Sequence, residues 1–430
     1  MSRHMQHADR RVVVTGSGVI SPIGHTVRDF WAALSQGRSG IRRISRYDVS
    51  DLPTQLAGEI TDFEPRDYMP NRTARRLDRF AQFALAAALE ALQEAGLEVS
   101  EELAPRTAVL LGSGYGPGQL IQSAVLDLAR DGRRAMTPYL ASGGGADSGA
   151  AEIAVRIGAR GPSGSTVAAC ASGATAIGDA LRLIRHGYAD VVVAGGSDDA
   201  VNPLDLAATA NVGALSRRCD PAAASRPFDR ARDGFVMGAG AGVVVLESAE
   251  HAERRGATIL AELAGYGVTT DLYHATRPHP QGLAAQQAMR DALADAALRP
   301  QDIDYICAHG TSTPLNDRIE SAAIREVFGP HALTTPISSV KSMTGHMIGA
   351  AGAVELIATV QTIRTGLVPP TLNCDDPEDR ELDFVPHRAR PHRTRAAMSN
   401  SFGFGGHNAV LVVREWPGTA HQHNPMEGER

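Results

Sequence analysis

The sequence predicts a duplicated α/β fold, and three observations support it. Apolar, β-branched runs that end in Gly-rich turns alternate with Ala- and Leu-rich helical segments along the chain. Two segments about half the chain apart share one pattern of strand, small-residue turn and helix, ending at Gly187 and at Gly366. A length of 430 residues exceeds one ordinary domain but fits two fused halves. Chance similarity between two such units is the alternative to duplication.

Each half carries its own series of predicted strands and at least one long helix. We predict an N-terminal half over 11–255 and a C-terminal half over 256–415, with flexible polar tails at 1–10 and 416–430. The strands expected in the first half are 11–18, 107–116, 165–173, 190–198 and 241–247, with a helix over 74–95. The second half has strand patterns in ILAELAGYGV, IDYICAHGTST, TPISSVKSMTG and NAVLVV, with a helix over 282–297.

The composition is that of a globular enzyme. The chain is 43% hydrophobic and 21% charged, and its net charge of -6 gives no support to a nucleic-acid or membrane-surface role. No apolar run approaches the ~20 residues that span a bilayer, and the polar N-terminus is unlike a signal peptide. We therefore expect no nucleic-acid partner, no membrane partner and a cytoplasmic location.

Four cysteines are scattered along the chain without CxxC spacing: Cys170, Cys219, Cys307 and Cys374. This distribution argues against a disulfide framework and against a zinc site. Cys170 differs from the others because it lies in AACASG, where an apolar strand meets a small-residue helix. The helix dipole and free N–H groups at such a turn favour a thiolate, so we predict a nucleophile. A buried structural cysteine is the alternative.

Two histidines lie on Gly-rich turns after apolar strands. His309 precedes a loop with Thr311 and Thr313, whose hydroxyls could bind an amide-bearing ligand. His346 lies five residues after Lys341, the only lysine in the chain. Either histidine alone is more often a satisfied polar group than a catalyst. Together with the cysteine they form a Cys/His/His set, whose spacing lacks the short-range pairing of structural metal sites, and we expect no metal.

Two further stretches offer backbone groups to a ligand. SNSFGFGGHN contains a flexible Gly turn with Phe402 and Phe404, which could supply oxyanion N–H groups and an aromatic gate; a bulge with two core rings is the alternative. TGSGVISPIG begins like a dinucleotide fingerprint, but Ser21 stands where the third Gly is needed, and Pro22 follows it. An NAD-dependent dehydrogenase is therefore the least favoured hypothesis.

Six motifs resemble, in order and over roughly residues 11–415, the β-ketoacyl-acyl carrier protein synthases of the thiolase superfamily, in the KAS I/II class. They are VVVTGSGVISPIG, AACASG, RPFDRARDGFVMG, AHGTSTPLND, VKSMTGHMIGAAGA and NSFGFGGHN. The resemblance is greatest to KAS II and type II polyketide ketosynthases. It implies a duplicated thiolase-like fold, layered α-β-α-β-α with two mixed five-stranded sheets.

The same resemblance implies a decarboxylative Claisen condensation. Cys170 would carry the acyl group, with the N–H groups of Cys170 and Phe404 as the oxyanion hole. His309 and His346 would donate hydrogen bonds to malonyl-carrier protein while CO2 leaves, extending the chain by two carbons. Lys341, paired with Glu320, would orient His309. No metal or redox cofactor is implied, because both substrates are thioesters on the carrier's phosphopantetheine.

The resemblance also assigns substrate contacts. Thr311 and Thr313 would hold the pantetheine amides, with Thr276 as a further candidate. Phe404 would gate the acyl pocket beside Phe402. Tyr115 stands where the KAS II pattern often has a smaller apolar residue near the pocket floor, which argues against long straight-chain substrates.

The expected partner is an acyl carrier protein, loaded with acyl or malonyl groups. The basic run Arg72, Arg75 and Arg76 matches positions that dock this acidic partner, although a solvated helix face is an equal alternative. The enzyme would be a homodimer, or a catalytic subunit that works only with a cysteine-less chain-length partner. Fatty-acid elongation and a type II polyketide pathway both remain open. A non-condensing partner subunit is a further hypothesis, and the presence of Cys170 argues against it.

Overall fold

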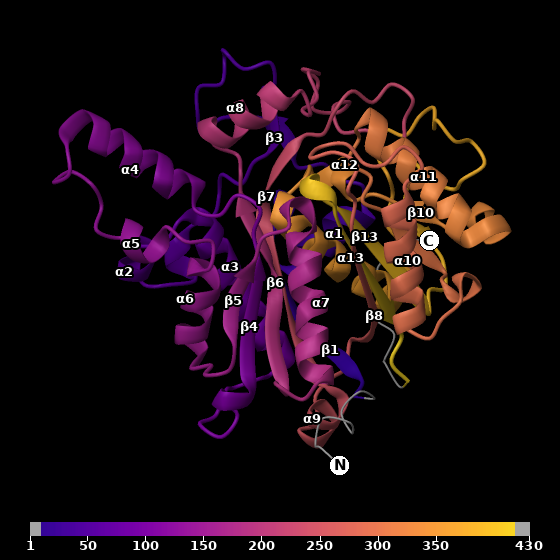
Figure 1. The fold of residues 1–430 in the computed structure, drawn as a ribbon, viewed down its shortest axis with the longest axis horizontal. Coiled ribbons are helices and arrows are strands. Elements are labelled where there is room, and N and C mark those ends of the chain that lie inside the picture. Colours follow the sequence, from indigo (N-terminus) through magenta and orange to yellow (C-terminus); the bar gives the residue numbers. More distant parts are fainter. Residues whose placement is uncertain (1–9, 418–430) are drawn as a thin grey trace, which may run out of the picture.

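The computed structural model describes residues 10–417, and its strands form two five-stranded halves (Figure 1). The first half has the order β5-β4-β6-β7-β1, in which β5, β4 and β6 are parallel and β7 runs antiparallel to both neighbours. Its strands are β1 (Val12–Ile20), β4 (Thr107–Gly112), β5 (Ser163–Thr166), β6 (Val191–Asp199) and β7 (Met237–Ser248).

The second half repeats this arrangement strand for strand. Its order is β10-β9-β13-β14-β8, with the first three strands parallel and β14 antiparallel to both neighbours. Its strands are β8 (Ala261–Thr270), β9 (Tyr305–Cys307), β10 (Ile337–Ser338), β13 (Ala396–Phe402) and β14 (His407–Arg414). Identical order, direction and chain sequence in both halves confirm the predicted duplication.

The two halves meet edge to edge for only three residues. Val12–Val14 of β1 pair antiparallel with Ala261–Leu263 of β8, which joins ten strands in one hydrogen-bonded series. Short strands extend it or stand apart: β2 (Ile41–Arg43) and β3 (Leu56–Gly58) add beside β7, while β11 (Leu367–Val368) pairs with β12 (Arg390–Pro391).

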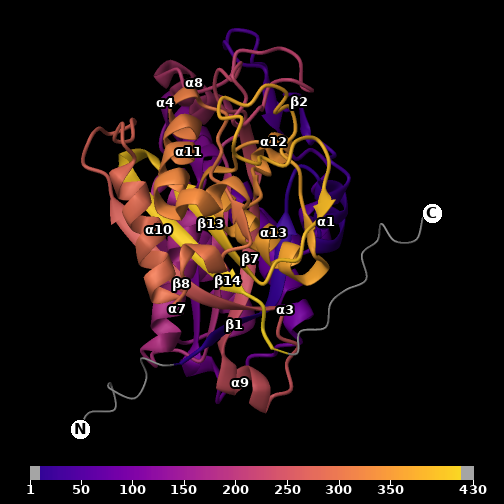
Figure 2. The same cartoon turned by 90° about the vertical axis from the view of Figure 1, so that its right-hand side faces the viewer.

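Helices cover both halves and fill the space between them (Figure 1, Figure 2). The outer face of the first half carries α3 (Arg79–Ala95) and α6 (Ser148–Ile157), and that of the second carries α10 (Leu283–Asp295) and α11 (Pro314–Phe328). Between them α7 (Ser172–Arg185) packs against α13 (Ala351–Thr365), which is buried from Ala351 to Arg364. The predicted α-β-α-β-α layering is confirmed. The remaining helices lie in the connections: α1 (Val27–Ser35), α2 (Asn71–Ala74), α4 (Gly118–Asp131), α5 (Leu140–Gly143), α8 (Pro203–Val212), α9 (Ala249–Arg254) and α12 (Lys341–Thr344).

The two central helices begin in the same unusual way. A single 3-10 turn precedes each: η4 (Ala169–Ala171) before α7 and η7 (Ile348–Ala350) before α13. The first residue of each turn is left-handed, with φ of 49° at Ala169 and 48° at Ile348. For a residue with a Cβ this conformation costs about 1–2 kcal/mol, so it persists only where the surrounding structure enforces it. The first turn carries Cys170, and the second follows His346.

Two expectations need correction. The helix predicted over 74–95 is divided, because Asp78 accepts a hydrogen bond from the N–H of Phe80 and so starts α3 anew. The strand predicted over 165–173 ends at Thr166, because the chain turns at Ala169. Gly16 lies inside β1, in agreement with the strand predicted over 11–18, and an added Cβ there would stand 2.0 Å from the Ala91 carbonyl oxygen. With a continuous strand there, the phosphate-binding turn of a dehydrogenase is missing.

The predicted tails lie mostly outside the described residues. Their innermost residues are held in place: Arg10 donates to Asp190 at 2.6 Å, and the guanidinium of Arg11 lies 3.9 Å from the ring centroid of Trp416. Over residues 10–417, no helix is both long enough and apolar enough to cross a membrane.

Candidate active site

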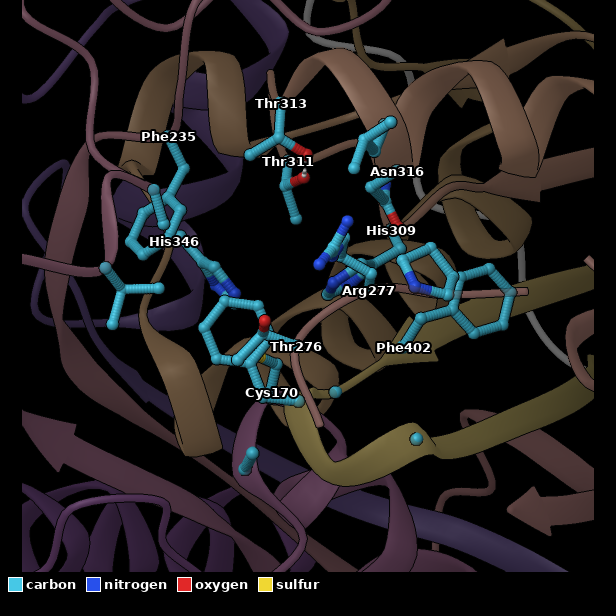
Figure 3. Close-up of a pocket in the computed structure, with 18 of the residues that line it drawn as sticks. Cys170, Phe235, Thr276, Arg277, His309, Thr311, Thr313, Asn316, His346 and Phe402 are labelled. Carbon is cyan, nitrogen blue, oxygen red and sulfur yellow. Dashed lines mark hydrogen bonds between the residues drawn. The ribbon is translucent and has the colours of Figure 1, made fainter. Parts of the chain in front are cut away.

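A cavity of about 610 Å³ is lined by residues from both halves, among them the predicted Cys170, His309 and His346 (Figure 3). Cys170 comes from η4, His309 follows β9, and His346 follows α12. The Cys170 sulfur and one nitrogen of each imidazole all lie within 4.8 Å of one another. The two imidazoles meet edge to face, with ring centroids 5.4 Å apart. Residues 139 and 37 positions apart in sequence thus form one reactive centre.

The glycine turn before β14 packs directly on the cysteine. Gly403 approaches so closely that an added Cβ would lie 2.7 Å from the Ala168 carbonyl oxygen and 3.1 Å from the Cys170 nitrogen. The backbone N–H groups of Phe404 and of Cys170 itself lower the pKa of the Cys170 thiol, as N–H dipoles close to the sulfur do. Two convergent N–H groups at the nucleophile are the arrangement of an oxyanion hole.

Cys170 is a thiol at rest. Burial raises its pKa to about 12, although Lys341 and the Phe404 N–H act in the opposite direction. The expectation that the helix start favours a thiolate is therefore wrong, because desolvation of the charged form exceeds the attraction of nearby positive charge and dipoles. If this sulfur acts as a nucleophile, the thiol must lose its proton during the attack.

Both histidines are neutral, and their surroundings fix the tautomer. Burial lowers the pKa of His309 and of His346 well below the usual value, and the Lys341 charge lowers both further. The ammonium of Lys341 lies 3.4 Å from Nδ1 of His309, and since an ammonium can only donate, that nitrogen accepts. Nδ1 of His346 accepts from the N–H of Ile348 at 3.3 Å. The proton of each neutral ring therefore lies on Nε2.

The His346 donor has no partner within the described structure. Its Nε2 is buried and makes no hydrogen bond there. An unsatisfied buried N–H costs free energy, and it is retained where a ligand will use it. The same tautomers disfavour a cation among these three side chains, because a metal needs the Nε2 lone pairs that protons occupy.

Lys341 pairs with Glu355, not with Glu320 as predicted. The Lys341 ammonium donates to the Glu355 carboxylate, with both side chains almost completely buried. Burial raises the pKa of Glu355 to about 7, and Lys341 opposes this rise. Glu355 comes from the central helix α13. The sequence signal was present: Glu355 is the only acidic residue in the apolar run 347–363.

Glu320 has a different task. Its two carboxylate oxygens accept from the backbone N–H groups of His309 and Gly310, each at 2.8 Å, and Asn400 donates at 3.1 Å. Burial raises the Glu320 pKa to about 6 while these donors act against the rise. Glu320 thus fixes the loop that carries His309. Its carboxylate binds the backbone N–H groups of this loop and not the predicted partner, the ammonium of Lys341.

Every predicted substrate-contact residue lines the cavity. The Thr311 and Thr313 hydroxyls are 2.9 Å apart and face it from the start of α11 (Figure 3). Thr276 lines the cavity from the 271–281 loop. The Phe402 ring is edge-on to the His309 ring, with 5.8 Å between the ring centroids. The hydroxyl of Tyr115 is 2.6 Å from the Thr209 hydroxyl on α8.

The predicted docking arginines lie away from the cavity. Arg72 and Arg75 are exposed on and beside α2, and Arg76 pairs with Glu152 at 2.6 Å. None of the three is among the lining residues. The structure therefore does not bring them to Cys170, His309 and His346.

Asp198 is a supporting residue that sequence reasoning missed. It accepts from the N–H groups of Gly114, Tyr115, Gly116 and Gly349 at 2.7–3.2 Å and from the Ser113 hydroxyl at 2.7 Å. One carboxylate thus joins two segments of the cavity wall. Its position at the end of the run DVVVAGGSD was visible, but its partners come from across the fold.

A duplicated α/β fold with a cysteine and two histidines at the junction of its halves defines a thiolase-like acyl-transferring class. A model of the β-ketoacyl synthase N-terminal domain matches residues 9–252, and one of the C-terminal domain matches 260–375. The chain belongs to the β-ketoacyl synthase family.

Relatives agree over nearly the whole length. The 3-oxoacyl-[acyl-carrier-protein] synthase 2 of Coxiella burnetii is 46% identical over 406 residues, 94% of this chain and 98% of that one. The Synechocystis enzyme of the same name is 44% identical over 95% of this chain and 98% of its own.

Solved structures of polyketide ketosynthases are similar as well. A type II ketosynthase in complex with its acyl-carrier protein (AntDE:AntF) has a TM-score of 0.87 and 35% identity, covering 95% of this chain and 100% of that one. The ishigamide ketosynthase/chain length factor has a TM-score of 0.87 and 39% identity, covering 95% and 99%.

Proposed function

We propose that this β-ketoacyl synthase condenses an acyl group held on Cys170 with malonyl-acyl carrier protein, with loss of CO2 and extension by two carbons. One observation carries the proposal. The glycine turn of Gly403 and Phe404 packs on Cys170, with N–H groups of Phe404 and Cys170 acting on its sulfur, while Nε2–H donors of His309 and His346 belong to the same cavity. Two separate donor pairs suit a reaction with two separate developing oxyanions.

In the first step the sulfur of Cys170 attacks the carbonyl carbon of the acyl thioester. The new carbon–sulfur bond forms, the bond to the pantetheine sulfur breaks, and the thiol proton leaves with that sulfur. The N–H groups of Cys170 and Phe404 stabilise the negative oxygen of the tetrahedral intermediate. Because the pKa of Cys170 is raised, we expect the thiol to lose its proton during acyl transfer and not to be ionised beforehand.

In the second step the bond between the malonyl carboxylate and its α-carbon breaks. The electron pair moves to the thioester carbonyl, and the enolate oxygen accepts from His309 and His346. The α-carbon then attacks the acyl carbon, and the Cys170 sulfur leaves and takes up one proton from solvent. Neutral imidazoles suit this role, because an imidazolium would cost more to bury.

We infer that the reaction needs no resident cofactor. Thioesters are already activated, the leaving CO2 supplies the electron pair, and the carrier's phosphopantetheine brings both substrates. The Thr311 and Thr313 hydroxyls support binding of the pantetheine amides, with Thr276, which also lines the cavity, as a further candidate. Phe404, on a glycine turn at the cavity, supports a gating role.

The proposed condensation also implies two kinds of protein partner. An acyl carrier protein delivers both substrates, and Arg72, Arg75 and Arg76 stay a proposed docking site. A second subunit, identical or chain-length-determining, is supported by the end strand β5 and by exposed apolar side chains on α4: Ile121, Val125, Leu126 and Leu128. The boundary near residue 255 and a cytoplasmic location also stay predictions.

The test supplies acyl-carrier proteins of graded length together with malonyl-carrier protein. It uses the chain alone and with any partner subunit encoded beside it, and mass spectrometry follows the Cys170 adduct and the product. Cys170→Ala should lose acyl transfer. If Cys170 stays unacylated and no product forms in either arrangement, the proposal is wrong. Saturated long-chain products would indicate fatty-acid elongation, and short or multiply ketonic products a polyketide pathway.

A further inference from the structure

The active-site cavity contains one arginine that the proposed chemistry does not use. Arg277 lies on the loop between β8 and α10, and its side chain points into the cavity (Figure 3). It is the only Lys or Arg among the described residues that line this space. No residue within 10–417 forms an ion pair or hydrogen bond with its guanidinium. A permanent cation without a counter-charge beside a substrate channel is suited to an anionic ligand.

The loop that carries Arg277 is fixed to the catalytic turn. The Asp271 N–H donates to the Gly406 carbonyl at 2.7 Å, and the Gly405 N–H donates to the Ala275 carbonyl at 2.6 Å. The Asp271 carboxylate accepts from the backbone N–H groups of Tyr273 and His279, so it is engaged within its own loop. These bonds hold Arg277 over the cavity beside the Phe404 turn.

Depth distinguishes the two ends of the cavity. Cys170, His309 and His346 are at most 8% exposed, whereas Arg277 is an exposed residue. A pantetheine arm that places its thioester at Cys170 has its phosphate at the opposite, outer end. Thr313 and Asn316 line the cavity as well and offer a hydroxyl and an amide.

We propose that Arg277 binds the phosphate of the phosphopantetheine arm at the entrance of the cavity; this inference rests on the proposed function. The malonyl carboxylate is the other anion that passes here. A cation bound to that carboxylate would stabilise it against loss as CO2 and so oppose the chemistry. A phosphate keeps its charge throughout the reaction, and a guanidinium can bind it with paired hydrogen bonds.

The experiment compares two donors that differ only in the phosphate: hexanoyl-pantetheine and hexanoyl-4′-phosphopantetheine. For each, kcat/KM of Cys170 acylation is measured in the full chain, in Arg277→Gln and in Arg277→Lys. The matched control is Arg254→Gln. Arg254 is an exposed arginine on α9, and α9 lies at the opposite end of the molecule from α8, which lines the cavity (Figure 1). The wild type should favour the phosphorylated donor about fivefold, a modest value because the site is open to water.

In Arg277→Gln this preference should fall to about one, while Arg277→Lys keeps part of it and Arg254→Gln keeps all of it. A preference unchanged in Arg277→Gln, or absent in the wild type, overturns the inference. If Arg277→Gln instead slows decarboxylation of malonyl-pantetheine, which has a carboxylate and no phosphate, the anion is the carboxylate and the inference is also wrong. Failure of either donor to acylate wild-type Cys170 would count against the proposed function itself.

Discussion

The lone lysine, Lys341, forms a buried ion pair with Glu355 beside His309. The same ammonium lies 3.4 Å from Nδ1 of His309. Because an ammonium has three donors and no acceptor, it can satisfy Glu355 and fix the His309 tautomer together. A guanidinium is planar, larger and fixed in geometry, which explains why arginine does not replace it here.

Lys341→Arg should therefore slow condensation at least tenfold, about 1.4 kcal/mol in the barrier, while acylation of Cys170 continues. The larger head must displace Glu355 or His309 in a fully packed site. Glu355→Gln is the companion variant, since it keeps the volume and removes the charge. Single-turnover acylation and steady-state condensation separate the two steps. Wild-type condensation by Lys341→Arg would show that the choice of lysine is incidental.

The pH dependence of decarboxylation tests the neutral histidines. Burial and the Lys341 charge hold the pKa of both rings well below the usual value near 6.5. Malonyl decarboxylation should therefore stay constant as the pH falls from 8 to 6.5. In Lys341→Met one cause of the lowering is gone, so protonation occurs at higher pH and the acidic limb of the profile moves upward. If the acidic limb stays in place or moves to lower pH, the Lys341 charge does not lower the pKa of the two histidines, and the prediction is wrong.

Replacing either histidine should slow malonyl decarboxylation and leave acylation of Cys170 intact. In His309→Ala and His346→Ala one enolate donor is missing, and malonyl decarboxylation should fall about 10²–10³-fold. Acylation should persist, because the oxyanion hole proposed for that step consists of backbone N–H groups of Cys170 and Phe404, which neither variant removes. The measurements are CO2 release and the mass of the acyl-enzyme. Normal decarboxylation in both variants would refute the proposed role.

The sequence predicted what depends on local pattern. The duplication, the layers and the positions of Cys170, His309 and His346 follow from strand–turn–helix patterns and from motifs. The partner of Lys341 was predicted wrongly, because two buried carboxylates, Glu320 and Glu355, were available and only packing decides between them. The thiol state of Cys170 also escaped prediction, since burial depends on the whole fold whereas a helix start can be identified locally.

Tyr115 tests how the cavity limits its acyl group. Its ring lines the cavity, and its hydroxyl is 2.6 Å from that of Thr209, so α8 anchors it there. Tyr115→Ala should remove this barrier and raise kcat/KM for long acyl donors relative to short ones by about tenfold. That estimate assumes about two further methylenes buried, at ~0.8 kcal/mol each.

Tyr115→Phe is the matched control, because it keeps the ring and loses only the bond to Thr209. Its length preference should stay near that of the wild type if the ring itself sets the limit. A competition between acyl-carrier proteins of 4 to about 16 carbons, with Cys170 adducts resolved by mass, gives the preference directly. An unchanged distribution in Tyr115→Ala would show that the limit lies elsewhere, whereas a shift in both variants would assign it to the anchoring hydrogen bond.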